Sequence, residues 1–197
     1  MTFLDFIFPF FGNSFKLDEE KKRIRFDMKH LKDDISDEER EEAAAAVFAK
    51  IEDSQEFTSA NVIMIYWSTP DELPTQTFIK KWHEKKLLIL PSIKGHKLNL
   101  KRYSSDANMV QRALGIYEPG LTEIYLGKVD LIIVPGAAFD RKKNRLGRGK
   151  GYYDRFFKKT KAFKIGVGFD CQLIEKVPAN MYDKRLDIIV TPSETVI

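Results

Sequence analysis

The hydrophobic residues fall into short apolar runs that alternate with amphipathic segments. The clearest run is NVIMIYW at 61–67, which is uninterrupted and rich in strand formers, as is typical of a strand buried on both faces. Strands that alternate with helices predict a single-domain α/β fold, with a mostly parallel sheet and helices on both faces; a mixed sheet is the alternative. Further strands are predicted at 87–90, 98–103, 130–134, 163–169 and 187–191, and helices at 18–32, 36–52, 75–86 and 151–159.

Two of the predicted helices carry specific local signals. In the first, Ile24, Met28 and Leu31 are spaced at i, i+4 and i+7, which predicts one apolar stripe. The second is preceded by Ser36, and Glu39 follows three residues later. This spacing is typical of a capping box, in which the two residues bond to each other's backbone N–H groups.

Length and composition are those of a globular domain. The chain has 197 residues, of which 43% are hydrophobic and 31% charged, so it can bury a core and keep a polar surface. Because no Pro/Gly/Ser-rich linker divides it, we expect one domain at 16–197, preceded by an apolar extension at 1–15. The single cysteine, Cys171, excludes an internal disulfide and favours a reducing, cytoplasmic setting.

The apolar extension lacks the features of an export signal. No Lys or Arg precedes its Phe-rich run, Asp5 and Pro9 interrupt the run, and no small-residue cleavage site follows. Spanning a bilayer requires about 20 apolar residues, and no segment of the chain approaches that length. We therefore expect no membrane attachment, and expect residues 1–15 to pack on the body or at a subunit contact.

Positive charge is concentrated between residues 141 and 164. This window holds eleven Lys and Arg against one acid, Asp154, whereas residues 33–56 hold ten Asp and Glu against two basic residues. An acidic block at helical spacing predicts a solvated helix face. Concentrated positive potential instead attracts phosphate groups, on a nucleotide, a metabolite or a nucleic acid.

Three glycines alternate with this positive charge. They permit close backbone approach, and their N–H groups can point into one concavity. The segment follows the predicted strand at 130–134, and ligands of open α/β sheets bind beyond the carboxyl ends of strands. It therefore predicts a phosphate cradle, although its spacing matches neither the P-loop nor the dinucleotide fingerprint; a basic turn without a ligand is the alternative. The cradle comprises Arg145, Gly147, Arg148, Gly149, Lys150 and Gly151.

The same segment resembles the signature of the 5-formyltetrahydrofolate cyclo-ligase family, whose members are also called methenyltetrahydrofolate synthetases. The matching motifs are PG-x-x-FD at 135–140 and NRLGRGKGYYD at 144–154. Weaker matches extend the resemblance from about residue 18 to 192. They are K-x-x-x-R at 21–25, a strand with an acidic-Thr element at 66–75, EP at 118–119, VP at 177–178, Asp183, and D-x-x-x-T at 187–191.

The resemblance implies ATP-driven closure of 5-formyltetrahydrofolate to 5,10-methenyltetrahydrofolate, with release of ADP and phosphate. An N-formyl group is a poor electrophile, so phosphorylation of its oxygen is needed to create a leaving group before the N10 nitrogen attacks the carbon. Phosphoryl transfer is catalysed mainly by positioning and by positive charge. The family therefore implies a triphosphate surrounded by Lys, Arg, backbone N–H groups and Mg²⁺.

The resemblance also implies a role for each matching residue. ATP would contact Lys21, Arg25, Arg145, Leu146, Gly147, Arg148, Gly149, Lys150, Gly151, Tyr152 and Tyr153. The folate would contact Trp67, Glu72, Arg148, Lys150 and Tyr152. The implied catalytic residues are Arg145, Lys150 and Tyr152. Mg²⁺ would be held by Asp154 and Asp183, with Asp187 as the alternative to Asp183.

The residues alone leave two other functions open. A basic window that contains Tyr and Phe is also compatible with a nucleic-acid-binding module. The cradle is also compatible with another ATP-dependent ligase or kinase of small molecules. With the resemblance included, we expect a small-molecule substrate, no nucleic-acid partner, and a monomer or weak homodimer.

Overall fold

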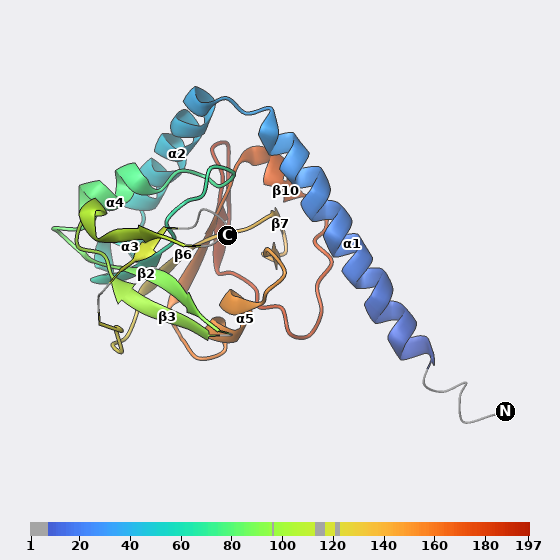
Figure 1. The fold of residues 1–197 in the computed structure, drawn as a ribbon. Helices are drawn as coiled ribbons and strands as arrows, with labels where there is room; N and C mark the ends of the chain where they lie inside the picture. The colour runs from blue at the N-terminus through green and yellow to red at the C-terminus, as the bar shows by residue number, and fades with distance from the viewer. Residues whose placement is uncertain (1–7, 96, 113–116, 121–122) are drawn as a thin grey trace.

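A seven-stranded sheet forms the centre of the computed structural model, which describes residues 8–95, 97–112, 117–120 and 123–197 (Figure 1). The strand order is β12-β11-β9-β6-β1-β2-β3. Strands β11, β9, β6, β1 and β2 run parallel, whereas the edge strands β12 and β3 are antiparallel to their neighbours. The predicted α/β sheet is therefore confirmed, in its mixed form. The strands are β1 (Val62–Ile65), β2 (Leu87–Lys94), β3 (Lys97–Arg102), β6 (Leu131–Pro135), β9 (Phe163–Val167), β11 (Ile188–Val190) and β12 (Thr195–Val196).

Helices cover both faces of this sheet. On one face lie α2 (Asp37–Glu52), α3 (Gln55–Ser59) and α4 (Gln76–Trp82), and on the other lies α5 (Tyr152–Phe157). Ile63 and Ile65 of β1 belong to the core under the first group, and Met64 belongs to the core on the opposite face. Successive strand residues point to opposite faces, so a strand covered on both sides must be apolar at every position.

The longest helix, α1 (Phe8–Asp33), lies at the side of the body, and its N-terminal part extends outwards in Figure 1. The helix is continuous across the boundary predicted between residues 15 and 16, and Phe15 is 70% exposed. The predicted packing of residues 1–7 lies outside the described part of the chain. Over the part that is described, no helix combines the length and apolar character that a bilayer crossing requires.

The buried face of α1 differs from the predicted apolar stripe at one position. Ile24 and Met28 are buried and contact Leu146 and its neighbours, as the stripe predicts. Leu31, however, is 49% exposed, and Lys32 is buried in its place. The prediction for Leu31 is wrong because the amine of Lys32 contacts oxygens of Asp71 on the loop after β1, as described below.

A second, three-stranded sheet includes the segment that connects β6 to the glycines at 147–151. It contains β7 (Ala138–Asp140), β8 (Arg145–Leu146) and β10 (Leu173–Ile174), and a separate pair is formed by β4 (Met109–Gln111) and β5 (Tyr117–Pro119). Asp140 is 1% exposed and accepts hydrogen bonds from the backbone N–H groups of Lys142, Asn144 and Val177. The bonds from Lys142 and Asn144 close the β7–β8 turn, and the bond from Val177 ties this turn to a distant segment. The turn positions the segment that begins at Gly147.

The predicted capping box at the start of α2 is present. Oγ of Ser36 accepts a hydrogen bond from the backbone N of Glu39 at 3.2 Å, and the Glu39 carboxylate accepts one from the backbone N of Ser36 at 2.8 Å. Ser36→Ala is expected to lower the free energy of unfolding by about 1 kcal/mol. Urea unfolding measures this change, with Ser59→Ala as a control because its exposed hydroxyl bonds only within α3. Equal midpoints for Ser36→Ala and wild type would contradict the prediction.

Candidate active site

The candidate site lies where the chain connections diverge from the centre of the sheet. β1 and β6 are parallel neighbours, but the chain leads from β1 to β2 on one side and from β6 to β9 on the other. Ligands of open α/β sheets bind at such a switch point, beyond the carboxyl ends of the strands. Residues 66–75 follow β1 and residues 136–151 follow β6, and both segments carry predicted site residues.

The glycine loop, residues 147–151, has a backbone that other residues would not adopt freely. Gly149 and Gly151 have φ angles of 94° and 63°, in the left-handed region that favours glycine. At Gly147, a Cβ atom would lie 2.9 Å from Nη1 of Arg145. The helix that follows is shorter than the predicted 151–159, since α5 has six residues and ends at Phe157. Its dipole therefore contributes less positive potential than predicted.

Arg145 lies two residues before Gly147, the first residue of the glycine loop, and only 4% of its side chain is exposed. Its Nη1 donates to the carbonyl oxygen of Pro135 at 3.1 Å, and its Nη2 lies 3.3 Å from Oδ2 of Asp154. The guanidinium carbon lies 5.1 Å from the centre of the Tyr153 ring. Burial lowers the pKa of Arg145, and the charge of Asp154 opposes that shift. Its buried Nε has no hydrogen-bond partner among the described residues, which leaves one donor unused.

Two basic residues of α1 lie beside the glycine loop. Nζ of Lys21 lies 2.5 Å from Oδ2 of Asp183, and Nε of Arg25 donates to the carbonyl oxygen of Gly147 at 2.8 Å. The two residues are four apart and share one helix face. Burial lowers the pKa of Arg25, although the charges of Asp18 and Asp183 act in the opposite direction. The fold thus brings the predicted K-x-x-x-R pair to the predicted phosphate cradle.

The two predicted Mg²⁺ ligands lie in neighbouring segments. Oδ1 of Asp154 accepts a hydrogen bond from the backbone N of Lys184, the residue after Asp183, at 3.3 Å. The described residues contain no group of three or more His, Cys, Asp or Glu arranged to hold a metal ion. Two carboxylates nevertheless fit Mg²⁺, which prefers oxygen, keeps several waters and also binds substrate phosphates. The alternative ligand, Asp187, lies beside β9, where its Oδ2 is 2.6 Å from Nζ of Lys164.

The loop that follows β1 brings Glu72 to the glycine loop. Oε1 of Glu72 lies 3.0 Å from Nη2 of Arg148, and 12% of the Glu72 side chain is exposed. Oε2 of Glu72 accepts a hydrogen bond from the backbone N of Thr69 at 3.0 Å, which fixes the orientation of the carboxylate. Glu72 and Arg148, both predicted to contact the folate, are therefore in direct contact although they are far apart in the sequence.

Asp71 and Lys32 belong to the same cluster but were not among the predicted site residues. Nζ of Lys32 donates to the carbonyl oxygen of Asp71 at 2.6 Å and lies 3.2 Å from its Oδ2. Burial raises the pKa of Asp71, but the hydrogen bond from Thr69 and the charges of Arg148 and Lys32 outweigh it and lower the pKa to about 2. The only sequence signal was position: Asp71 precedes Glu72, and Lys32 lies two helical turns beyond the K-x-x-x-R pair.

Three further predicted site residues differ from one another in their exposure and contacts. The hydroxyl of Tyr152 donates to the carbonyl oxygen of Gly95, in the turn between β2 and β3, at 3.1 Å. Lys150 is exposed on the glycine loop. Leu146 is 2% exposed and packs in the core beneath α1, so only its backbone can face a ligand.

The predicted aromatic contact of the folate, Trp67, lies just beyond the carboxyl end of β1. Its ring is half-buried and packs against Tyr103, with the ring centres 5.8 Å apart. Burial and the neighbouring Asp106 raise the pKa of Tyr103, so this tyrosine stays neutral. Trp67 thus packs against a neutral aromatic side chain at the same edge of the sheet as Glu72.

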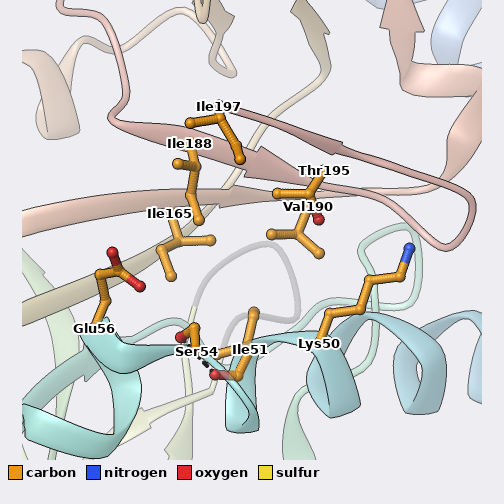
Figure 2. A pocket seen from close by; sticks show the side chains of 9 residues that line it. All are labelled: Lys50, Ile51, Ser54, Glu56, Ile165, Ile188, Val190, Thr195 and Ile197. Carbon is orange, nitrogen blue, oxygen red and sulfur yellow. Dashed lines mark hydrogen bonds between the residues drawn. The ribbon is translucent and has the colours of Figure 1, made fainter.

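A cavity of about 210 Å³ lies away from these clusters, between α2 and α3 on one side and β9, β11 and β12 on the other (Figure 2). Its lining is largely Ile and Val, and none of the predicted site residues lines it. Lys50 is at its margin, but its amine donates to the carbonyl oxygens of Thr191 and Pro192. The cavity therefore offers no chemistry that competes with the switch point as the candidate site.

Known proteins resemble the chain over almost its whole length. The model of the 5-formyltetrahydrofolate cyclo-ligase family matches residues 17–192. The chain is 31% identical over 183 residues to the 5-formyltetrahydrofolate cyclo-ligase of Haemophilus influenzae, covering 87% of this chain and 98% of that protein. It is 34% identical over 197 residues to a probable 5-formyltetrahydrofolate cyclo-ligase of Caenorhabditis elegans, covering 91% and 96%. The structure of 5,10-methenyltetrahydrofolate synthetase from Aquifex aeolicus matches with a TM-score of 0.80 and 34% identity, over 89% of this chain and 91% of that one.

These matches confirm the resemblance carried by the glycine loop. The matched range, 17–192, agrees with the range of about 18–192 expected from the motifs. The predicted class of enzyme, an ATP-dependent ligase that converts 5-formyltetrahydrofolate into 5,10-methenyltetrahydrofolate, is that of the family. The chain belongs to the 5-formyltetrahydrofolate cyclo-ligase family.

Proposed function

We propose that this chain binds ATP, Mg²⁺ and 5-formyltetrahydrofolate between residues 66–75 and 145–154, and there forms 5,10-methenyltetrahydrofolate, ADP and phosphate. The observation that carries the proposal is the contact between Arg148 and Glu72. Nη2 of Arg148, in the predicted phosphate cradle after β6, lies 3.0 Å from Oε1 of Glu72, the carboxylate after β1 that is predicted to bind the folate. A reaction between a bound phosphoryl group and a bound folate requires the two binding regions to meet in this way.

The folate end of the site is the loop that follows β1. The Glu72 carboxylate is oriented by the backbone N of Thr69, so it can accept the paired N–H donors on the edge of a pterin. Trp67, supported by Tyr103, offers a flat aromatic surface for stacking of the planar ring. Arg148 and Tyr152 complete the proposed contacts from the glycine loop and the start of α5.

The phosphate end is the glycine loop with α1 beside it. Lys21, Arg25 and Lys150 supply positive charge, and the loop supplies backbone N–H groups to phosphate oxygens. Asp154 and Asp183 are the proposed ligands of Mg²⁺, which when bound neutralises charge on the transferring phosphate. Nη2 of Arg145 lies 3.3 Å from Oδ2 of Asp154, which holds this carboxylate in position, and the charge of Arg145 lies near the start of the loop.

ADP release measured with a panel of acceptors tests this proposal. We expect release to require 5-formyltetrahydrofolate and to stay at background with unrelated carboxylic acids and alcohols. Release with another acceptor, and none with 5-formyltetrahydrofolate, would instead identify another small-molecule ligase or kinase. Tight, salt-sensitive binding of single-stranded RNA without folate-dependent ADP release would favour the nucleic-acid module. We expect the acting species to be a monomer or weak homodimer.

A further inference from the structure

Arg148 is held by three oxygens of the loop that follows β1. Its Nη2 lies 2.6 Å from Oγ1 of Thr69, 2.8 Å from Oδ1 of Asp71 and 3.0 Å from Oε1 of Glu72. The Arg148 side chain is 54% exposed, so these polar contacts, rather than packing, determine where the guanidinium lies. The contact with Glu72 is the longest of the three.

Asp71 is fixed more firmly than the arginine it binds. Nζ of Lys32, whose side chain is 6% exposed, contacts both the carbonyl oxygen and Oδ2 of Asp71. Oγ1 of Thr69 lies 2.7 Å from Oδ1 of Asp71. Nη1 of Arg40 in α2 donates to the carbonyl oxygen of Pro70 at 3.1 Å, which braces the same turn. Asp71 is therefore a fixed anion on a turn that α1 and α2 both hold.

We propose that Asp71 is a positioning residue for folate binding: it retains Arg148 when the substrate takes over the carboxylate of Glu72. The inference rests on the proposed function, in which Glu72 accepts the N–H donors of the pterin. With Asp71 in place, Arg148 loses only its longest contact when Oε1 of Glu72 accepts the N–H donors of the substrate. Without the charge of Asp71, Glu72 is the one carboxylate left in this cluster for Arg148, and the substrate must compete with that ion pair.

The substitution Asp71→Asn removes the charge and keeps the shape of the side chain. We expect it to raise KM for 5-formyltetrahydrofolate by about tenfold, the size of a typical coupling between contacting groups. We expect kcat, and KM for ATP, to stay within about twofold of wild type. A residue that merely stabilised the fold would not produce this split between the two substrates. Glu194→Gln, which removes one partner of the exposed Arg141 ion pair, is the matched control and should behave as wild type.

The decisive comparison repeats Asp71→Asn in an Arg148→Met background, using kcat/KM for the folate, which does not require saturation. There we expect Asp71→Asn to change kcat/KM by less than about twofold, because no guanidinium is left to compete for Glu72. Equal losses in both backgrounds, a loss confined to kcat, or no loss in either background would overturn the inference.

Failure of the proposed function and failure of the inference about Asp71 would give different results. If wild-type protein bound the folate but did not turn it over, the reaction assigned above would be wrong. Asp71 would still be tested by calorimetric titration of wild type and Asp71→Asn with 5-formyltetrahydrofolate. A weaker affinity of Asp71→Asn would support the positioning role, and equal affinities would overturn it. Absence of folate binding by folded wild type would overturn both proposals.

Discussion

Replacing Arg145 with methionine is expected to lower kcat/KM for ATP by about a hundredfold or more. Methionine is apolar and can occupy part of the buried volume, but it removes the charge at the start of the glycine loop. It also removes the donors to Pro135 and Asp154, so the Asp154 carboxylate loses its ion pair. Initial rates at varied ATP, with the folate saturating, measure this loss.

The same substitution is also expected to lower the free energy of unfolding by about 3 kcal/mol, because a largely buried carboxylate is left unpaired. Assays are therefore run well below the unfolding midpoint determined for the variant. Arg141→Met is the matched control: Arg141 is 68% exposed and pairs with Glu194, so its loss should cost less than about 1 kcal/mol and leave kinetics unchanged. If Arg145→Met kept wild-type kinetics, Arg145 would have no part in the phosphate site.

Replacing Asp154 with asparagine is expected to raise the Mg²⁺ concentration needed for half-maximal velocity by about tenfold or more. Asparagine preserves the shape of the side chain and keeps one oxygen, but it loses the charge that a hard cation prefers. The remaining oxygen can still accept the hydrogen bond from the backbone N of Lys184, so we expect a smaller effect on stability than on turnover. Magnesium titrations of initial rate, at fixed ATP and folate, measure the shift.

Asp183→Asn and Asp187→Asn separate the two candidates for the second ligand. We expect the Mg²⁺ requirement to rise in Asp183→Asn and to stay at the wild-type value in Asp187→Asn. The residue after Asp183 contacts Asp154 directly, whereas Asp187 contacts Lys164 of β9. A rise in Asp187→Asn alone would exchange the two assignments. If Asp154→Asn kept the wild-type requirement, the proposed metal site would be wrong.

The central strands of the fold could be predicted because burial on both faces leaves a strong local pattern. The apolar run at 61–67 contains β1, and the runs at 130–134 and 163–169 coincide with β6 and β9. The start of α2 was predictable for a different reason, since Ser36 and Glu39 satisfy backbone donors within one turn of each other. Both signals need only neighbouring residues.

The short strands could not be predicted in this way. β7, β8 and β10 contain two or three residues each, and β8 lies inside the basic window, where charge hides any apolar alternation. They become strands only because they pair with one another. Such pairing between distant segments leaves no periodicity for a sequence to show.

The candidate site also has one part that could be predicted from the sequence and another part that could not. The glycine loop is contiguous and could be identified from its spacing, and the resemblance supplied the roles of its residues. The clusters around it depend on long-range contacts: Arg148 and Asp71 are 77 residues apart, and Lys32 and Asp71 are 39 apart. Lys32 occupies the buried face where Leu31 was predicted because those contacts satisfy its charge. The burial of Arg145 could not be predicted either, since the residues around it in the sequence are mostly polar.

The absorbance of 5,10-methenyltetrahydrofolate formed from 5-formyltetrahydrofolate by purified wild-type protein tests the proposed reaction most directly. We expect product only when ATP and Mg²⁺ are both present, with one ADP released for each product formed. We also expect Arg145→Met to lose most of this activity and Arg141→Met to keep it. No product from folded protein, or product that forms equally without ATP, would contradict the assignment of this site as a folate-dependent phosphoryl-transfer centre.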